Sequence, residues 1–127
     1  MAVISGKDGK VMIGAAAVAD ITYWSFSTAA QNPAYASSAT AGYRKRLGGV
    51  KDGGGVIRGK LDLADAVTDD FNEGDAVTLL LYLNATKFYT VPAVIDRLQF
   101  EVDIDTGDVV GWEAEFSTNG AWTKPTY

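Results

Sequence analysis

Apolar and polar residues alternate in two segments near the C-terminal end of the chain. Every second residue is apolar between Leu98 and Asp105, and the same alternation returns between Val110 and Ser117. A period of two is typical of antiparallel strands that bury one face. The segment between them, Asp105-Thr106-Gly107-Asp108, has the composition of a turn. The pattern therefore predicts a hairpin with one apolar face and one acidic face.

The register of this hairpin follows from keeping one face apolar. A two-residue turn would set acidic against apolar side chains, whereas a connection with residues 106–108 at its tip pairs Ile104 with Val110 and Val102 with Trp112. On the other face, the same register brings acids together. The predicted acidic face has Glu101 opposite Glu113, Gln99 opposite Glu115, and Asp103 diagonal to Glu113.

This acidic face has three interpretations. Like charges that face each other across a ladder destabilise a sheet by a few tenths of a kcal/mol up to about 1 kcal/mol. The face is either an ordinary solvated surface or a surface that repels a passing polyanion or receives a basic patch of another subunit. The third interpretation is a Ca²⁺ site built from Asp103, Asp105 and Asp108, which offers oxygen ligands but lacks the spacing of the helix–loop–helix calcium motif.

Further strands are predicted upstream. A hairpin is expected around Gly6-Lys7-Asp8-Gly9, with Val3-Ile4 and residues 11–13 as its strands. The aromatic run 17–28 predicts a central strand, and residues 56–63 predict a strand with one wet face.

A nearly continuous apolar run, residues 76–83, predicts a strand buried on both faces that turns back into residues 87–91. Residues 64–72 have too little helical periodicity for more than a single turn or a short helix. The pattern therefore predicts one mainly β domain over residues 1–127, with one short helix and a long extended loop.

The long loop covers residues 29–55. It is rich in Ala, Ser, Thr and Gly, and its only large aliphatic side chains are Leu47 and Val50. Ordering such a segment costs conformational entropy that so few apolar groups cannot offset, so we expect it to become ordered against a partner. Its candidate contact residues are Tyr35, Tyr43, Arg44, Lys45, Arg46 and Lys51.

The amino-acid composition excludes several kinds of catalytic and metal-binding site. The 127 residues are 47% hydrophobic, which suits one core, and they include no Cys and no His. This excludes disulfides, thiolate nucleophiles, imidazole metal sites and a histidine general base. We therefore expect a protein that is not an enzyme and needs no cofactor or metal.

Residues 11–19 are too short an apolar run to span a membrane. Trp24 and Trp112 are expected in the core and Trp122 on the surface.

Charge is distributed unevenly along the sequence. Residues 1–60 carry eight bases and three acids, whereas residues 61–127 carry three bases and thirteen acids. The two halves therefore have net charges of +5 and −10, which give the net −5 of the whole chain. Opposite charges could pair within one molecule, or they could draw copies together head to tail.

The order of these features resembles a known family. The segments that carry the resemblance are Val50-Lys51-Asp52-Gly53-Gly54-Gly55-Val56 leading into Lys60-Leu61-Asp62, Glu73-Gly74-Asp75-Ala76-Val77-Thr78-Leu79-Leu80-Leu81-Tyr82, Ala93-Val94-Ile95-Asp96, and Glu101-Val102-Asp103-Ile104-Asp105-Thr106-Gly107-Asp108-Val109-Val110-Gly111-Trp112. The chain resembles the tail tube proteins of long-tailed bacteriophages, whose fold is related to that of contractile secretion tubes. The resemblance covers most of the chain as an order of elements.

The resemblance implies a ring-forming virion structural protein with the fold of an antiparallel β-sandwich or partial barrel, one short helix and a long extended loop. In that family about six copies form a ring, each adds about four strands to a shared inner barrel, and stacked rings form a hollow tube for DNA. It implies that the acidic face with Glu101, Asp103, Glu113 and Glu115 lines the lumen, and that the loop 29–55 reaches the adjacent ring.

Partners and location follow from the same resemblance. The implied partners are copies of the chain itself, a tail terminator, baseplate or tape-measure proteins, a sheath in contractile tails, and DNA in transient, non-specific proximity. The implied location is the virion tail, assembled in the host cytoplasm and without a membrane. Two alternatives are a capsid decoration or other virion protein, and a small carbohydrate-binding β-sandwich. Tube assembly separates the first reading from both alternatives.

Overall fold

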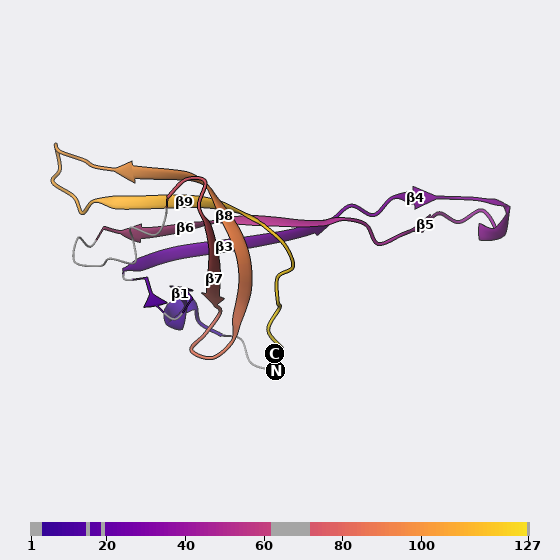
Figure 1. The fold of residues 1–127 in the computed structure, drawn as a ribbon, viewed down its shortest axis with the longest axis horizontal. Coiled ribbons are helices and arrows are strands. Elements are labelled where there is room, and N and C mark those ends of the chain that lie inside the picture. The colour runs from indigo at the N-terminus through magenta and orange to yellow at the C-terminus, as the bar shows by residue number, and fades with distance from the viewer. Residues whose placement is uncertain (1–3, 15, 19, 62–71, 127) are drawn as a thin grey trace.

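Antiparallel strands dominate the computed structural model, which describes residues 4–14, 16–18, 20–61 and 72–126 (Figure 1). The strands are β1 (Lys10–Ile13), β2 (Ala16–Ala17), β3 (Ile21–Ala30), β4 (Ala34–Tyr35), β5 (Lys45–Arg46), β6 (Lys51–Lys60), β7 (Ala76–Tyr82), β8 (Phe88–Glu101) and β9 (Gly111–Thr118). Two short 3-10 helices are described, η1 (Gly6–Asp8) and η2 (Ser38–Thr40). The short helix expected over 64–72 lies almost entirely outside the described residues.

One long strand joins two halves of the main sheet. Seven strands follow the order β2-β1-β7-β8-β9-β6-β3, while β4 and β5 form a separate pair. The first part of β8 pairs with β7 from Phe88 to Val94, and its second part pairs with β9 from Ala93 to Glu101. Figure 1 shows β8 curving between the two, with β7 running across the direction of β9, β6 and β3. The sheet thus folds over itself as a partial barrel, as the family resemblance implies.

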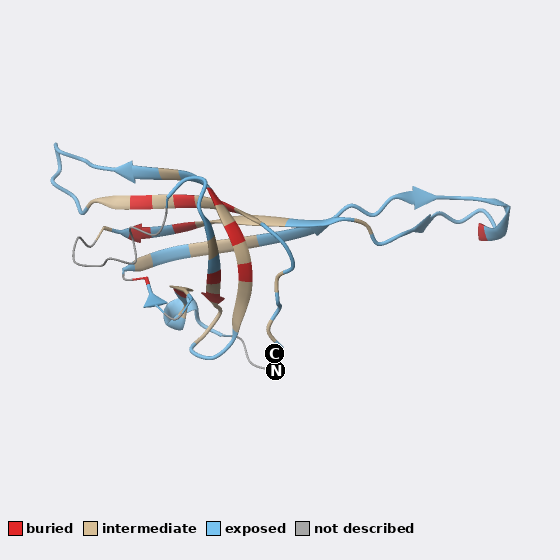
Figure 2. Cartoon of the chain, in the orientation of Figure 1, coloured by how far each residue is buried: buried red, intermediate tan, exposed pale blue. Residues whose placement is uncertain are grey.

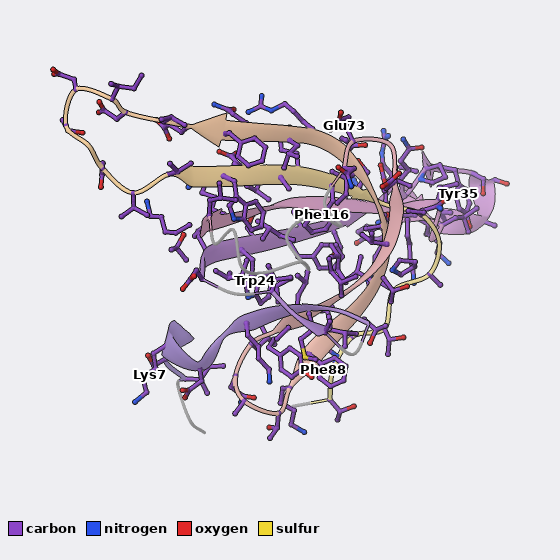
Figure 3. All side chains as sticks on the ribbon, turned by 60° about the vertical axis from the view of Figure 1, so that its left-hand side comes forward. Lys7, Trp24, Tyr35, Glu73, Phe88 and Phe116 are labelled. Carbon is purple, nitrogen blue, oxygen red and sulfur yellow. The ribbon has the colours of Figure 1, made fainter. Side chains whose placement is uncertain are left out.

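The core fills the inside of this fold. Its buried side chains are Val11, Val18, Ile57, Leu79, Leu81, Val91, Ala93, Ile95, Trp112, Ala114 and Phe116. The indole Nε1 of Trp24 donates to the backbone oxygen of Tyr82 at 3.2 Å, and so links the β3 edge to the end of β7. Figure 3 shows Trp24 in the space between the two halves of the sheet.

An aromatic cluster closes the other end of the core. The Phe26 ring lies 6.1 Å from the Phe116 ring, 5.3 Å from that of Tyr89 and 5.9 Å from that of Trp122. Trp122 is therefore half-buried, and the prediction that it is exposed is wrong. Trp112 is buried, as predicted.

Three strand predictions need correction. Residue Ile4 is 53% exposed and lies in no strand, because the chain forms the η1 turn before β1; Val3 lies outside the described residues. The strand β3 is an edge of the sheet and not its centre. In β7, Leu79 and Leu81 are fully buried while Thr78 is exposed, so only one face of this strand is buried.

The register of the last hairpin also differs from the prediction. Phe100 pairs with Trp112 and Glu101 with Gly111, so the connection covers residues 102–110. This register is two residues away from the predicted one, and a shift of two leaves every side chain on the same face. Alternation alone could not distinguish them. The observed register removes the Glu101–Glu113 repulsion and sets Arg97 opposite Glu115.

Candidate assembly surfaces

The outward face of the four strands β8, β9, β6 and β3 carries charged pairs. Arg58 lies opposite Glu113 with Nε and Oε2 3.6 Å apart, and Arg97 lies opposite Glu115 at 3.8 Å. The Arg58 guanidinium also lies 4.8 Å from the ring centre of Tyr23 on β3. Glu113 and Glu115 of β9 thus each have a basic neighbour, Arg58 on β6 and Arg97 on β8.

The acidic candidates separate into two groups. Glu113 and Glu115 lie on the outward face of β9, and Glu101 lies at the end of β8 opposite Gly111. Asp103 lies in the connection beyond the strands, so the four acids do not form one acidic face. The face has a small excess of acids: its strand residues include three bases, Arg58, Lys60 and Arg97, and five acids, Asp52, Asp96, Glu101, Glu113 and Glu115.

Asp103 instead shapes the β8–β9 connection. Its Oδ1 accepts a hydrogen bond from the backbone N–H of Thr106 at 3.2 Å. The backbone and side-chain hydrogen bonds from Thr106 hold the pKa of Asp103 below its ordinary value. Among the described residues, no group of three acids could hold a metal ion, so the calcium interpretation has no support in the geometry.

The outer edge of β3 is unpaired among the described residues. Its inner edge pairs with β6 over nearly its whole length, from Ile21 opposite Gly59 to Ala30 opposite Lys51. The N–H of Gln31 donates to the Val50 oxygen at 2.9 Å. Because antiparallel strands alternate between inward and outward backbone groups, the N–H and C=O groups of Trp24, Phe26, Thr28 and Ala30 then point away from β6.

The second half of β8 has an unpaired edge as well. β7 leaves β8 after the pair Ala76–Val94. Two backbone bonds continue this side: the Gly74 N–H donates to the Ile95 oxygen, and the Ile95 N–H donates to the Asp75 oxygen. Beyond a bulge at Asp96, the residues 97–101 pair with β9 alone in the part of the chain that is described. The four-stranded half of the sheet therefore has an open edge on each side. Open edges are templates for pairing with another chain.

Residues 31–50, which we call the arm, extend from the ends of β3 and β6. Figures 1 and 2 show the arm reaching far from the sheet, with nearly all of its residues exposed. It contains the β4–β5 pair, in which Ala34 lies opposite Arg46 and Tyr35 opposite Lys45. At its tip, Ser37 and Thr40 form a capping box around η2. Backbone hydrogen bonds, and not a core, give the arm its shape.

The predicted loop residues occupy this arm. Tyr35, Tyr43, Arg44, Lys45 and Arg46 all lie on it and are exposed. Lys51 is the first residue of β6, at the base of the arm. The glycines 53–55, which the sequence placed in the loop, belong to β6 and pair with both β3 and β9.

A second exposed segment lies at the other end of the molecule. Residues 100–109, which we call the acidic loop, leave the far end of β8 on the side opposite the arm (Figure 1). Phe100, Val102, Ile104 and Val109 are exposed here, Ile104 by 90%. No described helix is long and apolar enough to cross a membrane.

Comparison with known proteins rests on structure alone. No protein-family model matches the sequence, and no curated protein matches it. Solved structures do match the fold. A chain of the tail of an empty gene transfer agent particle, refined helically with C6 symmetry, superposes with a TM-score of 0.76 at 16% identity, over 98% of this chain and 100% of that one.

Two further structures agree. The tube of the phage SPP1 tail matches with a TM-score of 0.71 at 13% identity, over 98% of this chain and 80% of that one. A chain of the sheath–tube complex of the extracellular contractile injection system PVC matches with a TM-score of 0.72 at 13% identity, over 96% and 92% of the two chains. The fold is that of tail and injection-system tubes. The resemblance seen in the sequence is confirmed at the level of fold.

Sequence reasoning missed the two open edges. One signal for the edge position of β3 lies in the sequence of its pairing partner, β6. β6 has apolar residues on one face and glycines at 53–55 and 59, and this composition suits a strand with a neighbour on each side. The ion pairs of Glu113 with Arg58 and of Glu115 with Arg97 were also missed. They depend on strand neighbours and on a register that alternation does not fix.

Proposed function

We propose that this protein is a structural subunit of a tail tube, and not an enzyme. The observation that carries the proposal is the pair of open edges on the four-stranded half of a fold shared with tail tubes. The edge of β3 in one copy pairs with the edge formed by residues 97–101 of β8 in the next. Such a contact uses two different surfaces, so it repeats around a ring.

The dimensions of such a ring suit DNA. Six copies, the symmetry of the gene transfer agent tail, would each add four strands. A barrel of about 24 strands, with a spacing of about 4.8 Å and a tilt of about 40°, has a backbone diameter of about 48 Å. After side chains the opening is roughly 35 to 40 Å, wider than a DNA duplex.

We assign the outward face of the four strands to the lumen. Its arginines are held by Glu113 and Glu115, so they are less free to bind phosphate. A wall with paired arginines and a small excess of acids lets DNA slide without adhering. This replaces the uniformly acidic wall expected from the sequence.

Location and partners follow from the same role. The protein would reside in the virion tail, assembled in the host cytoplasm. Matching structures come from a sheath–tube complex, a tube-terminating cap and a baseplate. Corresponding terminator, baseplate, tape-measure and sheath proteins are the partners we propose here. Carbohydrate binding has less support, because none of the three tryptophans is fully exposed.

Electron microscopy tests the proposal directly. Negatively stained protein, concentrated at several salt concentrations, is expected to show hollow rings or tubes with an opening near the size derived above. Uniform small particles under every condition would contradict the tube role.

A proline at the open edge tests ring closure. Thr28→Pro removes an N–H that points away from β6, so the monomer should fold while ring formation is lost. The matched control, Ser27→Pro, removes an N–H on the β6 side and should instead lower monomer stability by about 3 kcal/mol. Thermal unfolding and size-exclusion chromatography give the two readouts. Normal rings from Thr28→Pro would refute edge pairing.

Removing the carboxylate partners of two arginines tests the assignment of this face to the lumen. In the double variant Glu113→Gln, Glu115→Gln, the arginines Arg58 and Arg97 lose their partners. Assembled tubes should then co-sediment severalfold more of a short labelled DNA duplex, while the free energy of unfolding changes by less than about 1 kcal/mol. The control Asp8→Asn, Glu73→Gln makes the same change of net charge elsewhere. Equal DNA binding by both would place the face outside the lumen.

A further inference from the structure

The core side of β8 is uncovered at the far end of the strand. Leu98 and Phe100 lie opposite the buried residues Ala114 and Trp112 of β9, so their side chains point to the core side of the sheet. Phe100 is nevertheless 52% exposed, because β7 has already left β8 at this point. Val102 beyond it is exposed as well. Apolar side chains that cluster in this way mark an interaction surface.

A hollow lies beside the start of β3. It has a volume of about 550 Å³ and is bounded by η1, by the first residues of β3 and by the end of β7. Its apolar lining consists of Ile21, Trp24, Tyr82 and Leu83, and Lys7 is the only charged side chain among the described residues that line it. The hydrogen bond from the Trp24 indole to the Tyr82 oxygen fixes one side of the hollow before any contact, which lowers the entropy cost of filling it.

The uncovered end of β8 and the hollow lie at the same end of the molecule. Successive strands in the order β8-β9-β6-β3 are antiparallel, so β8 runs opposite to β3. Figure 1 shows the end of β8 and the start of β3 at the same end of the sheet. In the proposed ring, the open edge of β8 in one copy therefore meets the open edge of β3 in the next as an antiparallel pair. This places Phe100 of the first copy near the hollow of the second.

The free backbone groups of the two edges belong to residues on the same face. On β3 they include those of Trp24 and Phe26, and Trp24 lies opposite the buried Ile57 on the core side. The alternation of backbone bonds, followed from β3 through β6 and β9, leaves the groups of Leu98 and Phe100 free on β8. These side chains also lie on the core side. The edges can therefore pair with apolar side chains beside apolar ones, which an edge of the opposite parity could not do.

We infer that Phe100 of one copy fills the hollow beside Trp24 of its neighbour in the same ring, and that this contact sets the register between the two subunits. Phe100 then lies opposite Trp24, and Leu98 lies opposite Phe26. A register shifted by two would set Phe100 opposite Phe26 and leave the hollow empty, although the Phe26 ring already packs against three aromatic rings of its own copy. The inference rests on the proposed tube role and adds the side chains that lock neighbouring subunits together.

Charge favours the same register. The acidic loop that follows Phe100 has four acids and no base, whereas Lys7 lines the hollow and Asp8 of the same turn does not. On the outward face, Glu101 comes to lie opposite Tyr23, whose ring centre is 4.8 Å from the Arg58 guanidinium. Neither ion pair found among the described residues involves Glu101. The contact therefore brings this acid towards a base of the neighbouring copy.

A disulfide between subunits tests the register. The chain has no native cysteine, so the double variant Ser25→Cys, Gln99→Cys carries the only two thiols, one on each open edge. In the inferred register these two positions form a directly opposite, non-hydrogen-bonded pair, with Cα atoms about 4.5 Å apart. That distance suits a disulfide. Mild oxidation should therefore give a ladder of covalent oligomers that ends at the number of copies in one ring.

The matched control moves one thiol by two residues along the same edge. In the double variant Ser27→Cys, Gln99→Cys the two positions are diagonal, with Cα atoms about 7 to 8 Å apart, which is too far for most disulfides. This variant should stay largely monomeric on a denaturing gel after the same oxidation. No ladder from Ser25→Cys, Gln99→Cys, or an equal ladder from the control, would overturn the inferred register.

Truncation of Phe100 tests whether its side chain fills the hollow. Phe100→Ala should change the melting temperature of the monomer by less than about 3 °C, because the side chain is exposed in a single copy. It should raise the protein concentration at which half of the chains are in rings by about tenfold or more. The control Val109→Ala truncates an equally exposed side chain of the acidic loop beyond the paired edge, and should change that concentration by less than about threefold. Sedimentation velocity measures both, and equal effects of the two variants would overturn the inference.

The inference and the tube role can fail separately. Rings of the parent chain without the ladder from Ser25→Cys, Gln99→Cys would leave the tube role standing and refute the inferred contact. Covalent oligomers without rings or tubes in electron micrographs would support the contact and refute the tube role. The absence of both would overturn both.

Discussion

Replacing Gly55 with alanine is expected to lower the free energy of unfolding by about 3 kcal/mol and the melting temperature by roughly 10 °C. A Cβ at this position would lie 1.9 Å from the backbone oxygen of Ser25 and 2.9 Å from Cζ of Phe116. Gly55 pairs with Phe26 on one side and Phe116 on the other, and their rings stack with centres 6.1 Å apart. Since β6 is enclosed by two strands, it cannot move aside.

Gly48→Ala is the matched control. Its Cβ would meet no atom within 4 Å, and its φ is not positive, so the stability should change by less than about 0.5 kcal/mol. Thermal and urea unfolding, followed by circular dichroism, measure both variants. Equal stability of the two would contradict the pairing of β6 between β3 and β9.

Deleting residues 36–42 is expected to abolish tubes while leaving rings and the folded subunit. The deletion removes η2 and the capping box, and it draws the arm tip back by about 10 Å. Tyr43 and Arg44 then form a two-residue turn between the paired Tyr35 and Lys45. The melting temperature should change little, because no residue of the core cluster lies in the arm.

Electron microscopy and size-exclusion chromatography distinguish rings from tubes here. In the control, a Gly-Ser segment of equal length replaces residues 36–42. This control separates the effect of the length of the arm from the effect of its sequence. Long tubes from the shortened chain would show that the arm does not join rings.

The arm and the open edges bear on the state of the free protein. Exposed edges and apolar patches promote irregular association as well as ordered assembly. The net charge of −5 opposes irregular association through repulsion between copies. We therefore expect assembly to depend on concentration and salt, since screening weakens this repulsion.

Strand positions were largely predictable from the sequence. The alternation from Leu98 to Phe100 and from Trp112 to Phe116 correctly gave the faces of β8 and β9, because side chains alternate with a period of two. The apolar run of β7 and its turn into β8 were also correct. The long polar segment between β3 and β6 correctly marked an extension from the core.

Other features could not be read from local pattern. The positions of Arg58 and Arg97 beside Glu113 and Glu115 depend on which strand lies next to which, and on a register shift of two that alternation does not detect. Local pattern also does not show which strands lie beside β6, and for this reason its glycines were placed in a loop. Their small size is needed only because Phe26 and Phe116 pack over them from neighbouring strands.

The sequence by itself determined the class of fold, the face of each clear strand, and the opposite charges of the arm and the acidic loop, because these depend on neighbours along the chain. The tertiary structure decided the strand order, the hairpin register and the two open edges, because they depend on pairings between residues far apart in sequence. It also decided that the arm and the acidic loop lie at opposite ends of one molecule. Only a folded sheet fixes which backbone groups remain unpaired and in which direction the charged ends point.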